Sequence, residues 1–174
     1  MKNVTKILSE EHQNILKVID VVLEECEQME NGKEINISFF KDLIYFIKNY
    51  ADGFHHAKEE NILFKTMLDD PENMHCNPIP VMLHEHDEGR NYVKGMEEAL
   101  LNNDVKKLIE NASGYSYLLQ EHIFKEDNIL YPMAEEGLND EQKLNVEKQY
   151  RNVSSQDFFK TDISDFILQL SQNR

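Results

Sequence analysis

Apolar residues recur at intervals of three and four along four segments of this chain, the spacing that keeps side chains on one face of an α-helix. Each of the four apolar stripes contains one histidine, and two of them contain a glutamate four residues after it. The stripes are Leu8, His12, Ile15, Ile19, Val22, Cys26; Phe40, Ile44, Ile47, Ala51, His55, Glu59, Ile62; Ile79, Met82, His86, Gly89, Val93, Met96, Leu100; and Leu108, Ala112, Tyr115, Leu119, His122, Glu126, Ile129, Met133. We expect four amphipathic helices that share one core.

Capping and breaking residues set the expected ends of these helices. Short loops between long amphipathic helices predict an all-α fold, an up-down-up-down four-helix bundle. The expected spans are Thr5 or Ser9 to Glu30, before Asn31 and Gly32; Asn36 or Ser38 to Asp69; Pro80 in the first turn to Leu101; and Asp104 to Tyr131, where Pro132 kinks or ends the helix.

The last part of the chain predicts one or two further short helices, around residues 140–151 and 162–172. We therefore divide the chain into a bundle, residues 1–137, and a C-terminal helical extension, residues 138–174, packed on it. The extension carries no histidine, and its apolar residues suit the cover of a bundle end or of a partner subunit. Those residues are Phe158, Phe159, Phe166, Ile167 and Leu170.

Composition narrows the classes of function. The 174 residues carry a net charge of −15, which repels phosphate backbones and anionic lipid surfaces, so we expect neither nucleic acid nor membrane as a partner. The first residues, MKNVTKILSEEHQ, lack the apolar core of a signal peptide, and we expect a cytoplasmic protein. Cys26 and Cys76 form no CxxC pair, so a disulfide framework is not indicated.

The polar residues on the apolar stripes are the candidates for a functional site. A buried carboxylate costs several kcal/mol unless it finds a cation, and no Lys or Arg lies on any stripe. A metal ion fits this need, because imidazole and carboxylate together are typical ligands of non-haem iron and are also accepted by zinc. The predicted metal ligands are His12, His55, Glu59, His86, His122 and Glu126.

Two further HxxxE pairs do not lie on the stripes. His56 with Glu60, and His84 with Glu88, have polar neighbours on their own faces, and we assign both pairs to the surface or the bundle rim. A further ligand from His56, Glu60 or His84 stays open.

With these residues in view, the chain resembles the hemerythrin-type (HHE) cation-binding domains. The resemblance covers roughly residues 5–135 and rests on the ordered set His, HxxxE, His, HxxxE in the segments EEHQNIL, FHHAKEENILF, MLHEHDEGR and EHIFKEDNILYP. It implies a cofactor of two non-haem Fe ions joined by an oxo or hydroxo bridge, with zinc as a substitute. It also implies that Glu59 and Glu126 bridge the ions, that His12 and His55 hold one, and that His86 and His122 hold the other.

One departure from the oxygen-carrying members bears on function. Their fifth histidine comes from an HxxxH pair on the third helix, and the matching position here is Met82. Each iron then keeps an open position, which favours a protein that binds or reacts with dioxygen, peroxide or nitric oxide, as sensor, scavenger or oxidoreductase, over a simple carrier.

Two other classes of function stay open: an iron-handling or iron–sulfur repair module, and a metal-binding bundle without redox turnover. The sequence names no electron donor and leaves the oligomeric state open, including a homo-oligomer. Gly89, next to the expected centre, either leaves room for a small ligand or allows close helix packing, and Tyr115 either packs or donates a hydrogen bond.

Overall fold

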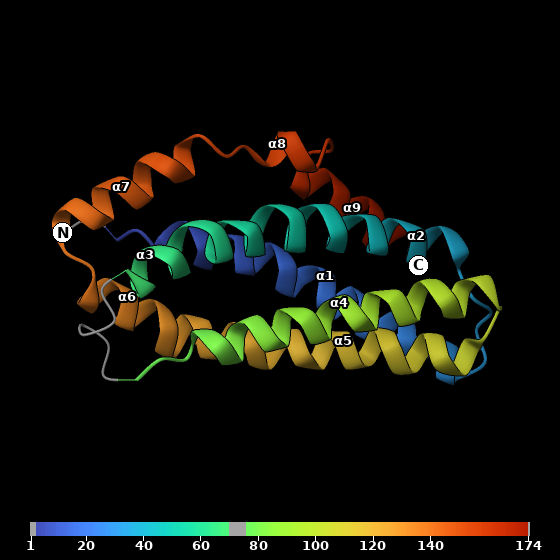
Figure 1. Cartoon of the computed structure of the whole chain (residues 1–174). Helices are drawn as coiled ribbons and strands as arrows, with labels where there is room; N and C mark the ends of the chain where they lie inside the picture. Colours follow the sequence, from blue (N-terminus) through green and yellow to red (C-terminus); the bar gives the residue numbers. More distant parts are fainter. Residues whose placement is uncertain (1–2, 70–75, 174) are drawn as a thin grey trace.

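A computed structural model describes residues 3–69 and 76–173, and the described part is helical without strands. Four long helical rods lie side by side in alternating directions, as Figure 1 shows. They are α1 (Lys6–Glu30); α2 (Ile37–Phe46) continued by η1 (Ile47–His56), η2 (Glu59–Leu63) and α3 (Phe64–Leu68); α4 (Ile79–Leu101); and α5 (Val105–Lys125) continued by η4 (Glu126–Leu130) and α6 (Tyr131–Gly137). The predicted all-α four-helix bundle is confirmed.

The helix ends follow the expected capping chemistry. The side chain of Asn36 accepts a hydrogen bond from the backbone N–H of Phe39, and that of Asp104 accepts one from Lys107. Beyond the end of α1, Gly32 has φ +98°, a conformation that glycine adopts without steric cost. These caps turn the chain sharply, so that consecutive rods run antiparallel.

The three η segments are wide, π-type turns, in which each residue advances by a smaller angle around the axis than in an α-helix. This changes which residues face inward. After η4 begins, Leu130 is 1% exposed, whereas Ile129, which the apolar stripe places in the core, is 47% exposed. The stripe prediction was wrong at Ile129, because it assumed a regular α-helical period.

Pro132 does not end the fourth rod at Tyr131. It lies in the first turn of α6, directly after η4, and the helix continues to Gly137. The hydrogen-bonding pattern changes at this point, so the missing N–H of proline costs least here.

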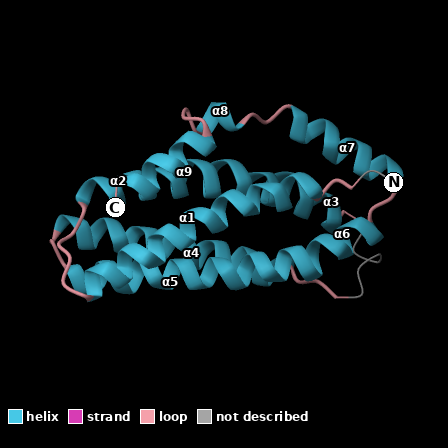
Figure 2. Ribbon diagram, turned by 180° about the vertical axis from the view of Figure 1, so that it is seen from behind, coloured by secondary structure: helices cyan, strands magenta, loops and turns pink. Residues whose placement is uncertain are grey.

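Three further helices follow one flank of the bundle (Figures 1 and 2): α7 (Asp140–Arg151), α8 (Ser155–Phe158) and α9 (Ile163–Gln172). Phe159, Phe166 and Leu170 are buried in the bundle core, so this segment covers a side of the bundle rather than its end. The division of the chain into units 1–137 and 138–174 stays a prediction. Within the described residues, no helix is both long and apolar enough to cross a membrane.

The bundle core consists of two apolar parts with a polar layer between them. On α1, Leu8 belongs to one apolar part and Ile15 to the other, with His12 between them. On α4, Met82 and Val93 flank His86 in the same way. The histidines therefore meet at one level of the bundle.

Candidate metal centre

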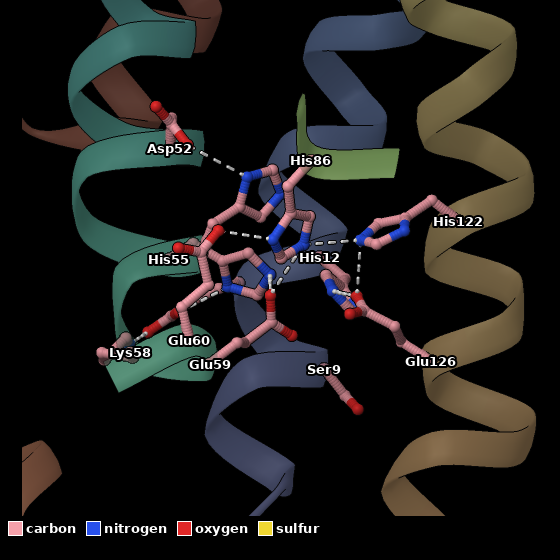
Figure 3. Close-up of polar contacts among 12 residues, drawn as sticks. Ser9, His12, Asp52, His55, Lys58, Glu59, Glu60, His86, His122 and Glu126 are labelled. Carbon is pink, nitrogen blue, oxygen red and sulfur yellow. Dashed lines mark hydrogen bonds and ion pairs between the residues drawn. The ribbon is translucent and has the colours of Figure 1, made fainter. Parts of the chain in front are cut away.

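All six predicted ligand residues converge in this polar layer, and Figure 3 shows them pointing toward one another from the four rods. None of their side chains is more than 2% exposed. His12 comes from α1, His86 from α4 and His122 from the end of α5. The other three, His55, Glu59 and Glu126, lie in the wide turns, a kind of turn that is frequent at functional sites.

Each glutamate reaches histidines on both sides of the centre. Oε2 of Glu126 lies 3.2 Å from Nε2 of His12 and 3.3 Å from Nε2 of His122. Oε2 of Glu59 lies 3.8 Å from Nε2 of His55 and 3.5 Å from Nε2 of His86. A carboxylate placed in this way can bind two cations at once, one on each side.

The donor atoms form two groups that share Glu59. In one group, those of His12, His55, Glu59 and Glu126 all lie within 4.8 Å of one another. In the other, His86 and His122 join Glu59 and also His56 within the same limit. The histidine pairs are those that the family resemblance implies.

The outward-facing nitrogens of the four histidines are held by carboxylates. Each Nδ1 lies within hydrogen-bonding distance of an Asp or Glu, which favours the tautomer whose Nε2 lone pair faces the centre. The pairs are His12 with Asp127 (3.0 Å), His55 with Glu11 (2.9 Å), His86 with Glu60 (2.8 Å) and His122 with Glu85 (2.9 Å). Imidazoles that ligate metals have this arrangement in proteins.

These outer carboxylates are fixed in turn by donors. Lys58 binds Glu11, Lys125 binds Glu85, Arg90 donates to Glu60 at 2.7 Å, and Ser9 donates to Asp127 at 2.6 Å. The sequence analysis missed this outer layer, because its members lie beside the apolar stripes and only tertiary packing brings them to the histidines. Their one sequence signal is position: Glu11, Glu60 and Asp127 each adjoin a predicted ligand, and Glu85 adjoins His86.

The polar atoms at the middle of the centre lack hydrogen bonds. Nε2 of His55, Oε2 of Glu59 and both carboxylate oxygens of Glu126 are buried and have no hydrogen bond among the described residues. Buried polar atoms are nearly always satisfied, and an ion is one of the few explanations for such a cluster of unsatisfied acceptors. The donor set and its orientation therefore fit a metal cation.

The two carboxyl groups differ in their pKa. Burial and the neighbouring Glu126 carboxylate raise the pKa of Glu59 well above its ordinary value. Burial also opposes ionisation of Glu126, but the imidazoles of His122 and His12 hold its pKa well below the usual range. Two close, buried carboxyl groups are expected to differ in this way, because each negative charge disfavours the other.

The histidines beside Glu126 are basic. Burial alone would lower their pKa, but Asp127 and Glu126 outweigh it and raise the pKa of His12 to about 9. Glu126 and Glu85 likewise raise the pKa of His122 to about 10. The carboxylates around these rings thus stabilise positive charge in the layer, which is the charge that a metal cation would supply.

His56 is not at the surface, and that assignment was wrong. The residue is 5% exposed, and its ring stacks on that of His86 with centroids 3.8 Å apart and planes 13° apart. The wide turn η1 is the reason, because it directs the consecutive residues His55 and His56 both toward the interior. The side chains of His84 and Glu88 are 73% and 49% exposed, as predicted for the other pair.

Distance alone would admit His56 as a ligand beside His86, but the stacking argues against it. An imidazole nitrogen binds an ion in the plane of its ring, along its lone pair. Two rings that lie face to face have their lone pairs in separate planes, so one ion does not suit both. Glu60 is not turned inward either, since it binds the outer nitrogen of His86.

Tyr131 adds a contact that the sequence analysis did not foresee. Its hydroxyl donates to Oε1 of Glu59 at 2.5 Å, and its ring stacks on His12 with centroids 5.4 Å apart. The buried phenol thus orients the carboxylate oxygen that does not face the histidines.

Comparison with known families identifies this arrangement. The family model of the hemerythrin HHE cation-binding domain matches residues 3–134, about three quarters of the chain. The chain belongs to the hemerythrin family. The six candidate ligands lie inside the matched segment, as in the predicted resemblance, whereas α7, α8 and α9 of this hemerythrin-family chain lie outside it. No curated protein matches the chain.

Proposed function

We propose that this hemerythrin-family protein is a non-haem di-iron protein that binds or reacts with dioxygen, peroxide or nitric oxide. The observation that carries the proposal is the position of the two glutamates, each of which places one oxygen between histidines of both groups. A single cation would leave half of this donor set unused. Two cations use all of it.

The ligand chemistry favours iron. The centre offers imidazole nitrogen and carboxylate oxygen, the mixture typical of non-haem iron, and no thiolate. Cys26 is buried among the apolar residues of the core cluster rather than at the centre, and Cys76 is exposed. Zinc accepts the same ligands, so the metal has to be measured.

In this proposal, His12 and His55 hold one iron, His86 and His122 hold the other, and Glu59 and Glu126 bridge. When bound, the iron pair supplies reversible electron transfer and positions that accept a small ligand. The four protein donors around each iron leave such positions free.

The chain's own residues prepare this site. The carboxylates on the outer nitrogens keep each imidazole in the tautomer whose inner nitrogen is free. Tyr131 holds one oxygen of Glu59 by its hydrogen bond, so the other stays directed between the histidines. The apolar parts of the core above and below exclude bulk water from the layer.

The test is metal analysis of the purified protein together with visible spectra of its oxidised and reduced forms. We expect two irons per chain and an absorption band that bleaches on reduction and returns with dioxygen or peroxide. Stoichiometric zinc in place of iron, or iron whose spectrum never responds to oxidant or nitric oxide, would contradict the proposal. The electron donor and the choice between sensor, scavenger and enzyme depend on which ligand reacts.

A further inference from the structure

A cavity lies beside the centre, between η1, α4 and α5. Its volume is about 80 Å³, several times the space that one buried water needs. Two rings of the polar layer, His56 and His86, form part of its wall, and Gly89 and Tyr115 form another part. The cavity therefore borders a residue to which the proposed function assigns an iron.

Two polar side chains in the cavity wall are buried without partners. Both ring nitrogens of His56 and the hydroxyl of Tyr115 lack a hydrogen bond among the described residues. Nδ1 of His56 does lie 3.5 Å from Asp52, which is too long for a strong hydrogen bond. Such groups carry a desolvation cost in the core, and a ligand that bonds to them would remove it.

The remaining wall is mostly apolar, and its outer rim carries balanced charge. Ile47 and Val93 contribute apolar surface, while Arg90 at the rim donates to Asp52 at 2.8 Å. Arg90 and Asp52 are partly exposed, at 40% and 31% of their side chains. Lys48 also lines the cavity and binds Glu97, so the cations of the wall are paired with carboxylates.

Gly89 has no side chain, and this leaves space for the cavity. A Cβ atom at this position would meet its nearest neighbour, Cε2 of Tyr115, at 3.6 Å, which is ordinary contact distance. Close helix packing therefore does not require glycine here. A larger side chain at residue 89 would extend toward the cavity instead.

We propose that this cavity is the binding site through which a small uncharged ligand of two or three heavy atoms reaches the centre, held by hydrogen bonds to Tyr115 and His56. This proposal rests on the proposed di-iron function, since a ligand in the cavity can react only when metal is bound at the centre. It assigns His56 to the ligand rather than to the metal. The neutral His56 ring can both donate and accept a hydrogen bond.

The first experiment tests the cavity without iron chemistry. Zinc-loaded protein is titrated with xenon, and ¹²⁹Xe NMR follows binding, because apolar cavities of this kind take up xenon. We expect saturable binding to the native chain and its loss in Gly89→Leu, with Gly89→Ala in between as the variant that perturbs folding least. Absence of xenon binding to the native chain, or unchanged binding in Gly89→Leu, overturns the proposal.

The second experiment tests the hydrogen bonds. Reduced, iron-loaded protein is mixed anaerobically with nitric oxide or with hydrogen peroxide in a stopped-flow spectrometer. Tyr115→Phe should slow the reaction with peroxide about fivefold, the effect of one hydrogen bond. Gly89→Leu should slow both reactions at least tenfold. The matched control is Tyr150→Phe, because Tyr150 also has a buried hydroxyl without a partner but does not line the cavity.

The outcomes separate the two proposals. Native rates in Gly89→Leu and Tyr115→Phe at full iron content would show that the ligand arrives elsewhere, while the di-iron function stands. A native protein that holds iron but reacts with neither probe would refute the di-iron function, and xenon binding would still decide whether the cavity takes a small uncharged molecule.

Discussion

Oε2 of Glu59 lies 3.5 Å from Nε2 of His86, although the two residues belong to different rods of the bundle. The same oxygen faces His55 on its own rod, so this carboxylate joins the two histidine pairs. Glu126 repeats the arrangement from the other side. A metal centre built in this way depends on both carboxylates at once.

The first prediction concerns these two residues. Glu59→Gln or Glu126→Gln keeps the shape of the side chain but replaces a charged oxygen by an amide, which binds metal less well. We expect metal content to fall from two ions to one or fewer per chain, measured by elemental analysis after equal loading. His84→Ala, at an exposed histidine, should retain both ions. Full metal in both glutamine variants would contradict the bridging assignment.

The second prediction separates His56 from the ligands. His56→Phe preserves the stack on His86 and should leave two metal ions per chain, because the ring of His56 is not directed at the same ion as that of His86. His86→Phe should lose at least one ion. Loss of metal in the His56 variant to the same extent would make His56 a ligand.

The third prediction tests the outer carboxylates. Glu85→Gln weakens the hydrogen bond that orients His122, and we expect metal affinity to fall about 10- to 100-fold, as for comparable outer residues. Competition with a chromophoric chelator measures the change. Glu88→Gln, on the same helix but paired with an exposed histidine, is the control and should bind metal normally.

The fourth prediction concerns a buried ion pair. Lys58 is 2% exposed, binds Glu11 and lies 3.9 Å from the ring of Phe54. Lys58→Met would leave the Glu11 charge buried without its cation, so we expect the free energy of unfolding to fall by about 3 kcal/mol. Urea denaturation measures it, and Lys65→Met, at an exposed lysine of the same rod, should change it by less than about 0.5 kcal/mol.

The fifth prediction distinguishes the two thiols. Burial raises the pKa of Cys26 to about 12, so at pH 8 its thiol stays protonated and shielded, whereas Cys76 is exposed. A colorimetric disulfide reagent at pH 8 should therefore modify one thiol per native chain and two in denaturant. Cys76→Ser should remove the fast reaction. Two fast thiols in the native protein would show that the core around Cys26 opens readily.

Much of the fold was predictable from the sequence, because the spacing of apolar residues and the helix caps depend only on residues that are near one another in the chain. The stripes through His12 and His86 hold along regular α-helices, where residues three and four apart share a face. The wide turns were not predictable, and there the same rule failed twice. It placed Ile129 inside and His56 outside, and the structure reverses both.

The amino-acid sequence by itself determined the number and direction of the rods and the six residues of the polar layer. Periodicity along one helix selects those residues, and the cost of burying carboxylates without a cation predicts a metal beside them. Only the tertiary structure decided which carboxylate holds each imidazole, where His56 lies and whether Gly89 borders a cavity. Those relationships join residues from different rods, and they depend on how the rods pack and on turns whose period differs from that of the α-helix.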